Sequence, residues 1–166
     1  MLIRPATEHD LSSVKAIYDE HVHHGIATFD VEAPPLDYWR TRLGSTEVGD
    51  HFLVADVDGV AVGYSYSSAY RPRPGYRHTR ETSVYLADSA QGRGLGRQLY
   101  DALLDTLRAD GVRTALAVVA LPNPASQALH RACGFTALGV MHEVGWKFER
   151  WIDTEWWELS LASAPV

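Results

Sequence analysis

The sequence predicts an α/β fold, in which strands and helices alternate, and three stretches carry that prediction. Glu81 to Leu86 alternates in polarity as a strand does, and it leads through a glycine-rich turn into a helical pattern. Asp58-Gly59 separates two apolar runs, which is typical of a tight β-hairpin. Ala115 to Ala120 is an unbroken apolar run, as expected of a strand that is covered on both faces. Together these stretches indicate a sheet flanked by helices.

Length and composition exclude several classes of protein. The chain has 166 residues, enough for one domain with a full core, and its 46% hydrophobic and 22% charged residues are ordinary for a globular protein. A net charge of −6 argues against nonspecific nucleic-acid binding, which depends on a basic surface. The single cysteine excludes an internal disulfide and fits a reducing cytoplasm. Because no apolar run resembles a signal peptide or a membrane span, we expect one cytoplasmic domain over residues 1–166, with no membrane partner.

The N-terminal quarter is expected to contain a short strand and two helices. Residues 1–4 form the strand, and Thr7 caps the first helix, with Asp10 three residues later as an acidic variant of the capping box. Gly25 ends that helix, and a second, shorter helix covers residues 36–43. The apolar stripe of the first helix consists of Leu11, Val14, Ile17, Tyr18 and Val22.

Three histidines lie near the end of the first predicted helix: His21, His23 and His24. They lack cysteine or carboxylate neighbours at a spacing typical of metal sites. We expect them to be exposed, where the negative end of the helix dipole favours them, and we expect no metal.

The middle of the chain is expected to form four strands and a long helix. Residues 51–57 and 60–67 are the two strands of the hairpin, and residues 78–86 form the strand that precedes the glycine-rich turn. The long helix covers residues 95–110, and the buried strand after it covers residues 113–120. The apolar stripe of the long helix recurs at four-residue steps: Leu95, Leu99, Leu103 and Leu107.

The C-terminal quarter is expected to add a helix and further strands. Asn123 is a good N-cap, Pro124 is a good first helical residue, and Gly134 ends the helix. Phe135 starts another strand, and residues 141–161 hold two strands that complete the sheet. The aromatic residues of this tail are Trp146, Phe148, Trp151, Trp156 and Trp157. Because acidic residues outnumber basic ones there, core or dimer packing is favoured over a nucleic-acid stacking surface.

The glycine-rich turn from Gln91 to Arg97 is a candidate anion site. Glycines let the backbone approach a ligand closely, and the first N–H groups of the following helix have no internal partners. Together with the helix dipole, such a turn most often binds phosphate. Its Gly-x-Gly-x-Gly spacing matches neither the dinucleotide fingerprint nor the nucleotide-triphosphate P-loop. A turn that only caps the helix is the alternative interpretation.

Two loops hold candidate residues for a substrate pocket. Arg71, Arg73 and Arg77 project from a loop that two prolines stiffen, and guanidinium groups bind carboxylate or phosphinate with two parallel hydrogen bonds. The alternative is a solvated basic loop. Phe29 lies in the loop between the first two helices, where it could line a cleft or pack into the core.

Several motifs in register resemble the GNAT superfamily of N-acetyltransferases. Gln91, Gly94 and Gly96 fill the pattern Gln/Arg-x-x-Gly-x-Gly/Ala of its pyrophosphate loop. Asn123 begins the next helix and a Gly-Phe pair ends it, as in that family. The resemblance implies a GNAT fold, with a mixed, mostly antiparallel sheet of about seven strands that is splayed in the middle and flanked by about four helices.

Further motifs are similar to one branch, the phosphinothricin and methionine sulfoximine N-acetyltransferases. They are Ala27-Thr28-Phe29, Arg77-His78-Thr79, Glu81-x-Ser83-Val84-Tyr85, Leu121-Pro122-Asn123-Pro124 and Gly145-x-Lys147-x-x-x-Trp151-x-Asp153. The resemblance covers nearly the whole chain, and it implies a homodimer.

The resemblance also implies that acetyl-CoA binds where the strand of Glu81 separates from the strand at residues 113–120. The pantetheine arm would pair with the backbone there, and the glycine-rich turn would hold the pyrophosphate. The implied cofactor-binding residues are Val84, Tyr85, Leu86, Gln91, Gly92, Arg93, Gly94, Leu95, Gly96, Arg97, Asn123 and Ser126. Transfer would be direct, through a tetrahedral intermediate, and Cys133 lacks the activating motif of a nucleophile.

Glu81 and His130 are the candidate catalytic residues. An amine is acylated in its uncharged form, so a base must remove a proton, and the resemblance puts the catalytic carboxylate at Glu81. An ordinary strand glutamate that faces solvent is the alternative. His130 stands where many relatives have a tyrosine that protonates the departing sulfur. It could be an acid, a second base, or a histidine with purely structural hydrogen bonds, and the sequence does not choose among these roles.

The expected activity is transfer of an acetyl group from acetyl-CoA to the α-amino group of a small amino-acid-like substrate, such as phosphinothricin or methionine sulfoximine or sulfone. Arg71, Arg73 and Arg77 would bind its acidic group, and Phe29 would form one wall of its pocket. The alternatives are a protein N-terminus or a polyamine as acceptor, or a non-catalytic acyl-CoA-binding sensor. An arginine-lined pocket disfavours a polyamine.

Overall fold

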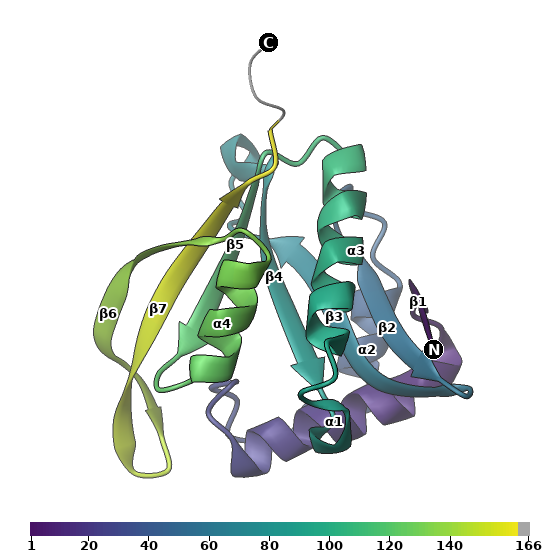
Figure 1. The fold of residues 1–166 in the computed structure, drawn as a ribbon, viewed down its shortest axis with the longest axis horizontal. Coiled ribbons are helices and arrows are strands. Elements are labelled where there is room, and N and C mark those ends of the chain that lie inside the picture. The colour runs from purple at the N-terminus through teal and green to yellow at the C-terminus, as the bar shows by residue number, and fades with distance from the viewer. Residues whose placement is uncertain (163–166) are drawn as a thin grey trace.

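The computed structural model describes residues 1–162 and contains a seven-stranded sheet with helices on both faces (Figure 1). The strands lie in the order β1-β2-β3-β4-β5-β7-β6; β4 and β5 are parallel, and the other neighbours are antiparallel. The strands are β1 (Leu2–Pro5), β2 (Phe52–Val57), β3 (Val60–Ala69), β4 (Thr79–Leu86), β5 (Thr114–Ala120), β6 (Thr136–Lys147) and β7 (Arg150–Ser160). The α-helices are α1 (Leu11–His24), α2 (Leu36–Leu43), α3 (Leu95–Ala109) and α4 (Pro124–Ala132). The predicted mixed, mostly antiparallel sheet with four flanking helices is confirmed.

The two faces of the sheet carry different helices because side chains alternate along each strand. In β2, Leu53 and Ala55 pack into the core under α3, whereas Phe52 and Val54 pack into the core under α1 and α2. Figure 1 shows α3 and α4 together on one face of the sheet, with α1 and α2 on the other. Among the described helices, none is both long and apolar enough to cross a membrane.

The sheet opens between β4 and β5. These parallel strands pair at Thr79 with Thr114, Arg80 with Ala115 and Glu81 with Leu116, and no pair follows. Beyond that point the two strands diverge, as Figure 1 shows. The predicted splay is therefore present, and it begins directly after Glu81.

The C-terminal hairpin corrects one prediction. A strand starting at Phe135 and a separate strand starting near Met141 are wrong, because β6 is one continuous strand of 12 residues. Its pairing with β7 shifts register between Ala137 and Gly139 and again between Met141 and Gly145. Such bulges interrupt the polar and apolar alternation that marks a strand in a sequence, while the strand itself continues.

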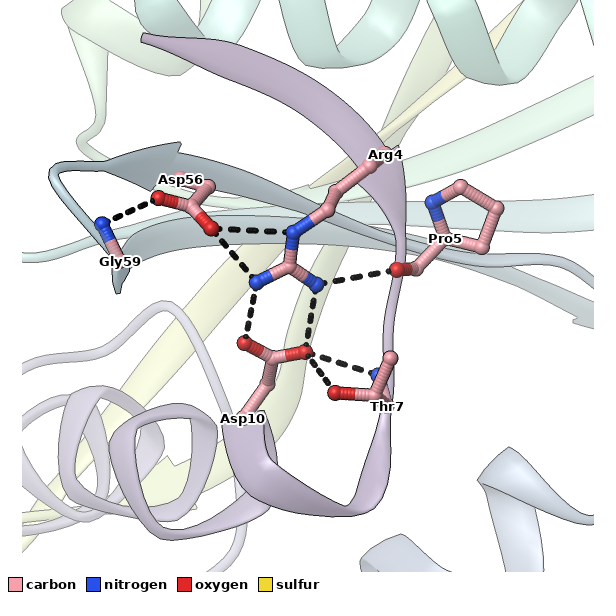
Figure 2. A network of polar contacts seen from close by, with 6 residues as sticks. All are labelled: Arg4, Pro5, Thr7, Asp10, Asp56 and Gly59. Atoms are coloured by element: carbon pink, nitrogen blue, oxygen red, sulfur yellow. Dashed lines mark hydrogen bonds and ion pairs between the residues drawn. The ribbon is translucent and has the colours of Figure 1, made fainter.

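The N-terminal strand is tied to the first helix and to the β2–β3 hairpin by Arg4 (Figure 2). The Arg4 guanidinium donates to both carboxylate oxygens of Asp10, at 2.7 and 2.8 Å, and to Asp56 at 2.7 and 3.0 Å. Asp10 also accepts hydrogen bonds from the backbone and the hydroxyl of Thr7, both at 2.8 Å. The predicted pairing of Thr7 with Asp10 is thus present, although it caps a 3₁₀ turn at Glu8–Asp10 that precedes α1.

We expect Asp10→Asn to lower the free energy of unfolding by ~2 kcal/mol at neutral pH, because charge-assisted hydrogen bonds to a buried carboxylate are lost. Hydrogen bonds from Arg4 are the main reason that the pKa of Asp10 is lowered from 3.8 to about 2. A lowered pKa in the folded state stabilises the fold above the unfolded-state pKa, and this stabilisation is lost as the pH falls toward the folded-state value. The difference between wild type and variant, measured by urea unfolding, should therefore shrink as the pH is lowered from 5 to about 2.

Asp105→Asn is the matched control. The Asp105 side chain is 77% exposed and pairs with Arg108 at 2.8 Å, so its loss should change the free energy of unfolding by at most ~0.5 kcal/mol. Equal destabilisation by both substitutions would contradict the special role of Asp10.

Candidate active site

A cavity of about 390 Å³ occupies the opening between β4 and β5. Its walls are β4 from Thr82 to Leu86, β5 from Val118 to Ala120, and the N-terminal ends of α3 and α4. The predicted cofactor-binding residues on this wall are Val84, Tyr85, Leu86, Gln91, Gly92, Gly94, Leu95, Gly96, Arg97, Asn123 and Ser126. Arg93, the remaining predicted one, is exposed and does not line the cavity.

The edge of β4 toward the cavity is open for pairing. The Ala87 N–H donates to Val62 O of β3 at 2.9 Å, so the N–H groups of Val84 and Leu86 point the other way, toward β5. Since β5 pairs with β4 only as far as Glu81, these groups meet no strand there. An extended ligand with amide groups can pair with such an edge as an added strand would.

The N-terminus of α3 meets the same cavity. Gly94 is the N-cap, in a left-handed conformation with φ +76°, and no side chain caps the helix. The first N–H groups of the helix are therefore left for a ligand, and the helix dipole favours an anion. The Arg97 side chain lies at the rim, 3.2 Å from Asp101.

The N-terminus of α4 completes the cavity wall. Asn123 is the N-cap, as predicted, and its side-chain oxygen accepts the Ser126 N–H at 3.1 Å. Pro124 occupies the first turn, where its missing N–H costs no hydrogen bond.

His130 lies on α4 at the inner wall of the cavity and is 3% exposed. Its Nδ1 is 2.7 Å from the Ser126 carbonyl oxygen, which can only accept, so Nδ1 carries the proton. Nε2 then accepts from the Tyr100 hydroxyl, at 2.9 Å. Burial lowers the pKa of His130, which favours the neutral ring.

Tyr100 is a cavity residue that the sequence analysis missed. It is fully buried on α3, and burial raises the pKa of its phenol, so the hydroxyl keeps its proton. Its oxygen also lies 3.3 Å from Thr82 Oγ1 of β4. Tyr100 lies next to the apolar stripe of α3 in the sequence, and no local pattern distinguishes it from a core residue.

Glu81 lies where the last β4–β5 pair ends and the cavity begins. It is half-buried, faces the α1–α2 side of the sheet opposite Ser68 of β3, and does not itself line the 390 Å³ cavity. Burial raises the pKa of its carboxyl group. A buried carboxylate with a raised pKa is a stronger base than an exposed one, which suits a group that must accept a proton.

Phe29 lies between the core and the solvent. It is 37% exposed, and its ring lies on the backbone of Gly145, where a Cβ atom would approach to 2.3 Å. Its loop is fixed because Lys147 donates to the Thr28 carbonyl at 2.9 Å and Tyr18 meets the Thr28 hydroxyl at 2.6 Å. The position of Phe29 is therefore set by β6 and α1 together.

The three loop arginines are exposed and do not line the 390 Å³ cavity. Arg71 lies over the Tyr70 ring at 5.0 Å, and Tyr70 packs against Trp156 of β7. Arg73 and Arg77 precede and follow a 3₁₀ turn at Pro74–Tyr76. The structure thus does not bring these arginines and the cofactor-binding residues into one cavity.

His21 corrects a second prediction. His23 and His24 are exposed as expected, but His21 is half-buried and lines the cavity. Its Nε2 donates to the Leu86 carbonyl at 3.2 Å, and its ring packs on Tyr85. The prediction was wrong because it considered only the C-terminal end of α1, whereas His21 also contacts β4.

Comparison with known proteins decides the family. Residues 3–156 match the family described as "Acetyltransferase (GNAT) domain". The chain belongs to the GNAT acetyltransferases. Within this family it is 44% identical to a phosphinothricin N-acetyltransferase of Alcaligenes faecalis over 155 residues, 92% of this chain and 78% of the relative. It is 38% identical to an L-methionine sulfoximine/L-methionine sulfone acetyltransferase of Pseudomonas paraeruginosa, over 98% of both chains.

A solved GNAT structure relates the fold to a ligand. The phosphinothricin acetyltransferase of Sinorhizobium meliloti, in complex with AcCoA, superimposes with a TM-score of 0.92 at 37% identity, covering 99% of this chain and 92% of that one. Both the sequence comparison and the structural comparison thus confirm the predicted resemblance to acetyl-CoA-dependent amino-acid N-acetyltransferases.

We expect Gly94→Ala to weaken coenzyme A binding by about 10-fold, because alanine at φ +76° costs ~1–2 kcal/mol and relaxation of the turn would re-aim the first N–H groups of α3. Isothermal titration with coenzyme A measures this. Gly59→Ala is the control: φ is +86° in the β2–β3 turn, and at both glycines an added Cβ would have no atom within 4 Å. Equal losses of affinity in both variants would contradict a binding role for the turn.

Proposed function

We propose that the protein transfers the acetyl group of acetyl-CoA to the α-amino group of a small amino acid with an acidic or strongly polar head, of the phosphinothricin and methionine sulfoximine or sulfone type. The observation that carries the proposal is the 390 Å³ cavity, in which the open edge of β4 meets the uncapped N-terminus of α3, directly beyond Glu81. The relatives that act on such acceptors match nearly the whole chain.

The residues present fit acetyl-CoA. The open N–H groups of Val84 and Leu86 and the Val84 carbonyl suit the amides of an extended pantetheine arm, and the α3 N-terminus with Gly94 suits a pyrophosphate. Arg97 adds positive charge at the rim, and Asn123 and Ser126 supply polar groups on the opposite wall. When bound, acetyl-CoA supplies an activated acetyl thioester.

Glu81 is proposed as the general base. An α-amino group with a pKa of roughly 8 is largely protonated at neutral pH, and only its neutral form attacks a carbonyl carbon. The raised pKa of the Glu81 carboxyl narrows the gap between base and amine, which makes the proton transfer less unfavourable. Direct contact and a bridging water would both allow this role.

His130 is proposed as a second base and not as the acid. Its Nδ1–H is committed to the Ser126 carbonyl, and its Nε2 lone pair accepts from the Tyr100 hydroxyl, so His130 would take up a proton through that hydroxyl. Its lowered pKa keeps the ring neutral near pH 7. A thiolate with a pKa near 8.5 is already a fair leaving group, so departure of the sulfur does not demand a strong acid.

The acceptor is proposed to bind on the α1–α2 side of the sheet, which Glu81 faces. Phe29 would form one wall of its pocket, and Arg71, Arg73 and Arg77 would supply positive charge around it. A cationic polyamine would be repelled by these groups, whereas an amino acid with an acidic head would be attracted.

We also propose a homodimer that forms through the β6–β7 hairpin. Strand β6 is an edge of the sheet, and its free backbone adjoins exposed apolar side chains. These are Leu138, Val140, Met141, Val144, Trp146, Phe148 and Trp151. Sedimentation equilibrium at micromolar concentration is expected to give the dimer mass, and Trp146→Lys is expected to give a monomer; a monomeric wild type would contradict the proposal.

The function is tested by acetyl-CoA-dependent thiol release with a panel of acceptors. We expect turnover with phosphinothricin, methionine sulfoximine and methionine sulfone, and little with spermidine or short peptides. Turnover with peptides alone would favour a protein N-terminus as acceptor. Coenzyme A binding without turnover on any acceptor would favour a non-catalytic sensor.

Glu81→Gln should lower kcat by about 100-fold or more, as is typical when a general base is lost. In the wild type, kcat/KM should fall as the pH drops through the pKa of Glu81, because the base works deprotonated. Burial raises that pKa, so this fall should lie above the usual glutamate value of 4.5, and it should be absent in the variant. The matched control is Glu20→Gln, at a 72% exposed side chain on α1, which should leave the rate and profile unchanged. An unaltered rate in Glu81→Gln would remove Glu81 from the mechanism.

A further inference from the structure

A second cavity, of about 470 Å³, lies between the end of α2 and the end of β3. It is separate from the cavity between β4 and β5, and most of its lining residues have polar side chains. The lining residues are Tyr38, Thr41, Arg42, Ser45, Asp50, His51, Ser67, Ser68 and Ala69. None of these was assigned a role from the sequence.

Arg42 is held rigidly in this cavity. Its guanidinium carbon lies 3.8 Å from the centre of the Tyr66 ring, and Nη2 donates to the Tyr38 hydroxyl at 3.0 Å. Stacking on an aromatic face fixes the plane of a guanidinium without neutralising its charge.

The positive charge of Arg42 has no acidic partner within residues 1–162. Its Nε is buried and has no hydrogen-bond acceptor there. By contrast Arg40, on the same helix, pairs with Glu8 and Asp37, both at 2.7 Å. A partly buried guanidinium with an unused donor, among polar side chains in a cavity, is a site for an anion, because an unsatisfied donor costs free energy.

The other ionisable groups of this cavity are already engaged. Asp50 Oδ2 accepts from the Ser45 hydroxyl at 2.7 Å, and Oδ1, which has no hydrogen bond within the described residues, lies 3.2 Å from Arg80 Nη1 in an ion pair that balances its charge. His51 pairs with Asp110 at 2.8 Å. Arg42 therefore carries the charge in this cavity that is left for a ligand.

The cavity adjoins Glu81 through β3. Ser68, which lines the cavity, is the direct partner of Glu81 in the β3–β4 ladder, and Tyr66 follows on the same face. Two residues along a strand span about 7 Å, so Arg42 on the Tyr66 ring lies beyond the position that faces the attacking amine. This separation suits a group at the far end of an amino-acid side chain better than the carboxylate next to the amine.

We propose that Arg42 and this cavity bind the distal acidic group of the acceptor, a phosphinate or a similar anion, while Glu81 faces its α-amine. The proposal rests on the proposed acetyltransferase function and adds to it the residue that selects acceptors with an acidic side chain. It differs from the assignment to the loop arginines, because Arg42 is fixed by a helix and a ring and the loop arginines are exposed.

The test compares two acceptors in two variants. Phosphinothricin has a distal anion, whereas methionine sulfone has a neutral side chain and the same α-amino and α-carboxylate groups. We expect Arg42→Gln to raise KM for phosphinothricin by about 10- to 100-fold, with kcat changed by less than about 3-fold and KM for methionine sulfone unchanged. Arg42→Lys should restore part of the loss, since it keeps the charge without the fork.

Arg40→Gln, on the same helix, is the matched control and should leave both KM values unchanged. Methionine sulfone turnover reports that each variant is folded and binds acetyl-CoA. Equal rises of KM for both acceptors would overturn the proposal in favour of the α-carboxylate, and unchanged KM values would exclude Arg42 from substrate binding. Absence of turnover by the wild type would instead contradict the acetyltransferase function itself.

Discussion

The separation of β4 from β5 is the constraint on which the site depends. Each strand is fully paired on its other side: β4 with β3 from Arg80 to Leu86, and β5 with β7 from Thr114 to Ala120. Beyond Glu81, the facing edges of β4 and β5 are therefore the two edges of the sheet that lack a strand between them. Unpaired backbone groups are costly to bury, so the opening favours a ligand that supplies the missing hydrogen bonds. Side chains bridge the point where the two strands separate. Thr82 Oγ1 donates to the Leu116 carbonyl at 3.0 Å, where the next backbone hydrogen bond between β4 and β5 would otherwise form, and it lies 3.3 Å from the Tyr100 hydroxyl.

The parallel crossover explains why two helix N-termini meet at this opening. A parallel pair needs a long connection, and α3 starts at the C-terminal end of β4 before the chain returns through β5. Helix α4 in turn starts at the C-terminal end of β5. Both dipoles thus direct positive charge toward the wide end of the opening, and Figure 1 shows the two helices side by side on that face. The placement of these two helix N-termini therefore favours an anionic ligand even without a contribution from charged side chains.

Most of the fold, and most of the residues that line the cavity between β4 and β5, could be predicted because their signals are local. Gly94 and Asn123 act on the next few residues, and the Asp58-Gly59 hairpin is closed by its own turn. His21 and Tyr100 could not be predicted, because their roles come from strands that are distant in sequence. The same holds for the strand bulges of β6, whose register is set by β7. For binding of the acceptor, the sequence suggested the loop arginines by residue type alone. The structure favours Arg42, whose guanidinium is partly buried and has no acidic partner within residues 1–162.

Glu81 shows how the site and the stability of the fold oppose each other. Its pKa is raised because burial disfavours the charged carboxylate in the folded state. A raised carboxyl pKa means that the folded protein loses stability relative to the unfolded chain as the pH rises through these pKa values. The charged Glu81 carboxylate, which the proposed role as base requires, is therefore held at a cost to folding, and an ion pair that relieved this cost would also lower the pKa and weaken the proposed base. Arg4, on the edge strand β1, illustrates the opposite arrangement: its ion pairs with Asp10 and Asp56 stabilise the charged forms of these carboxyl groups and the fold together.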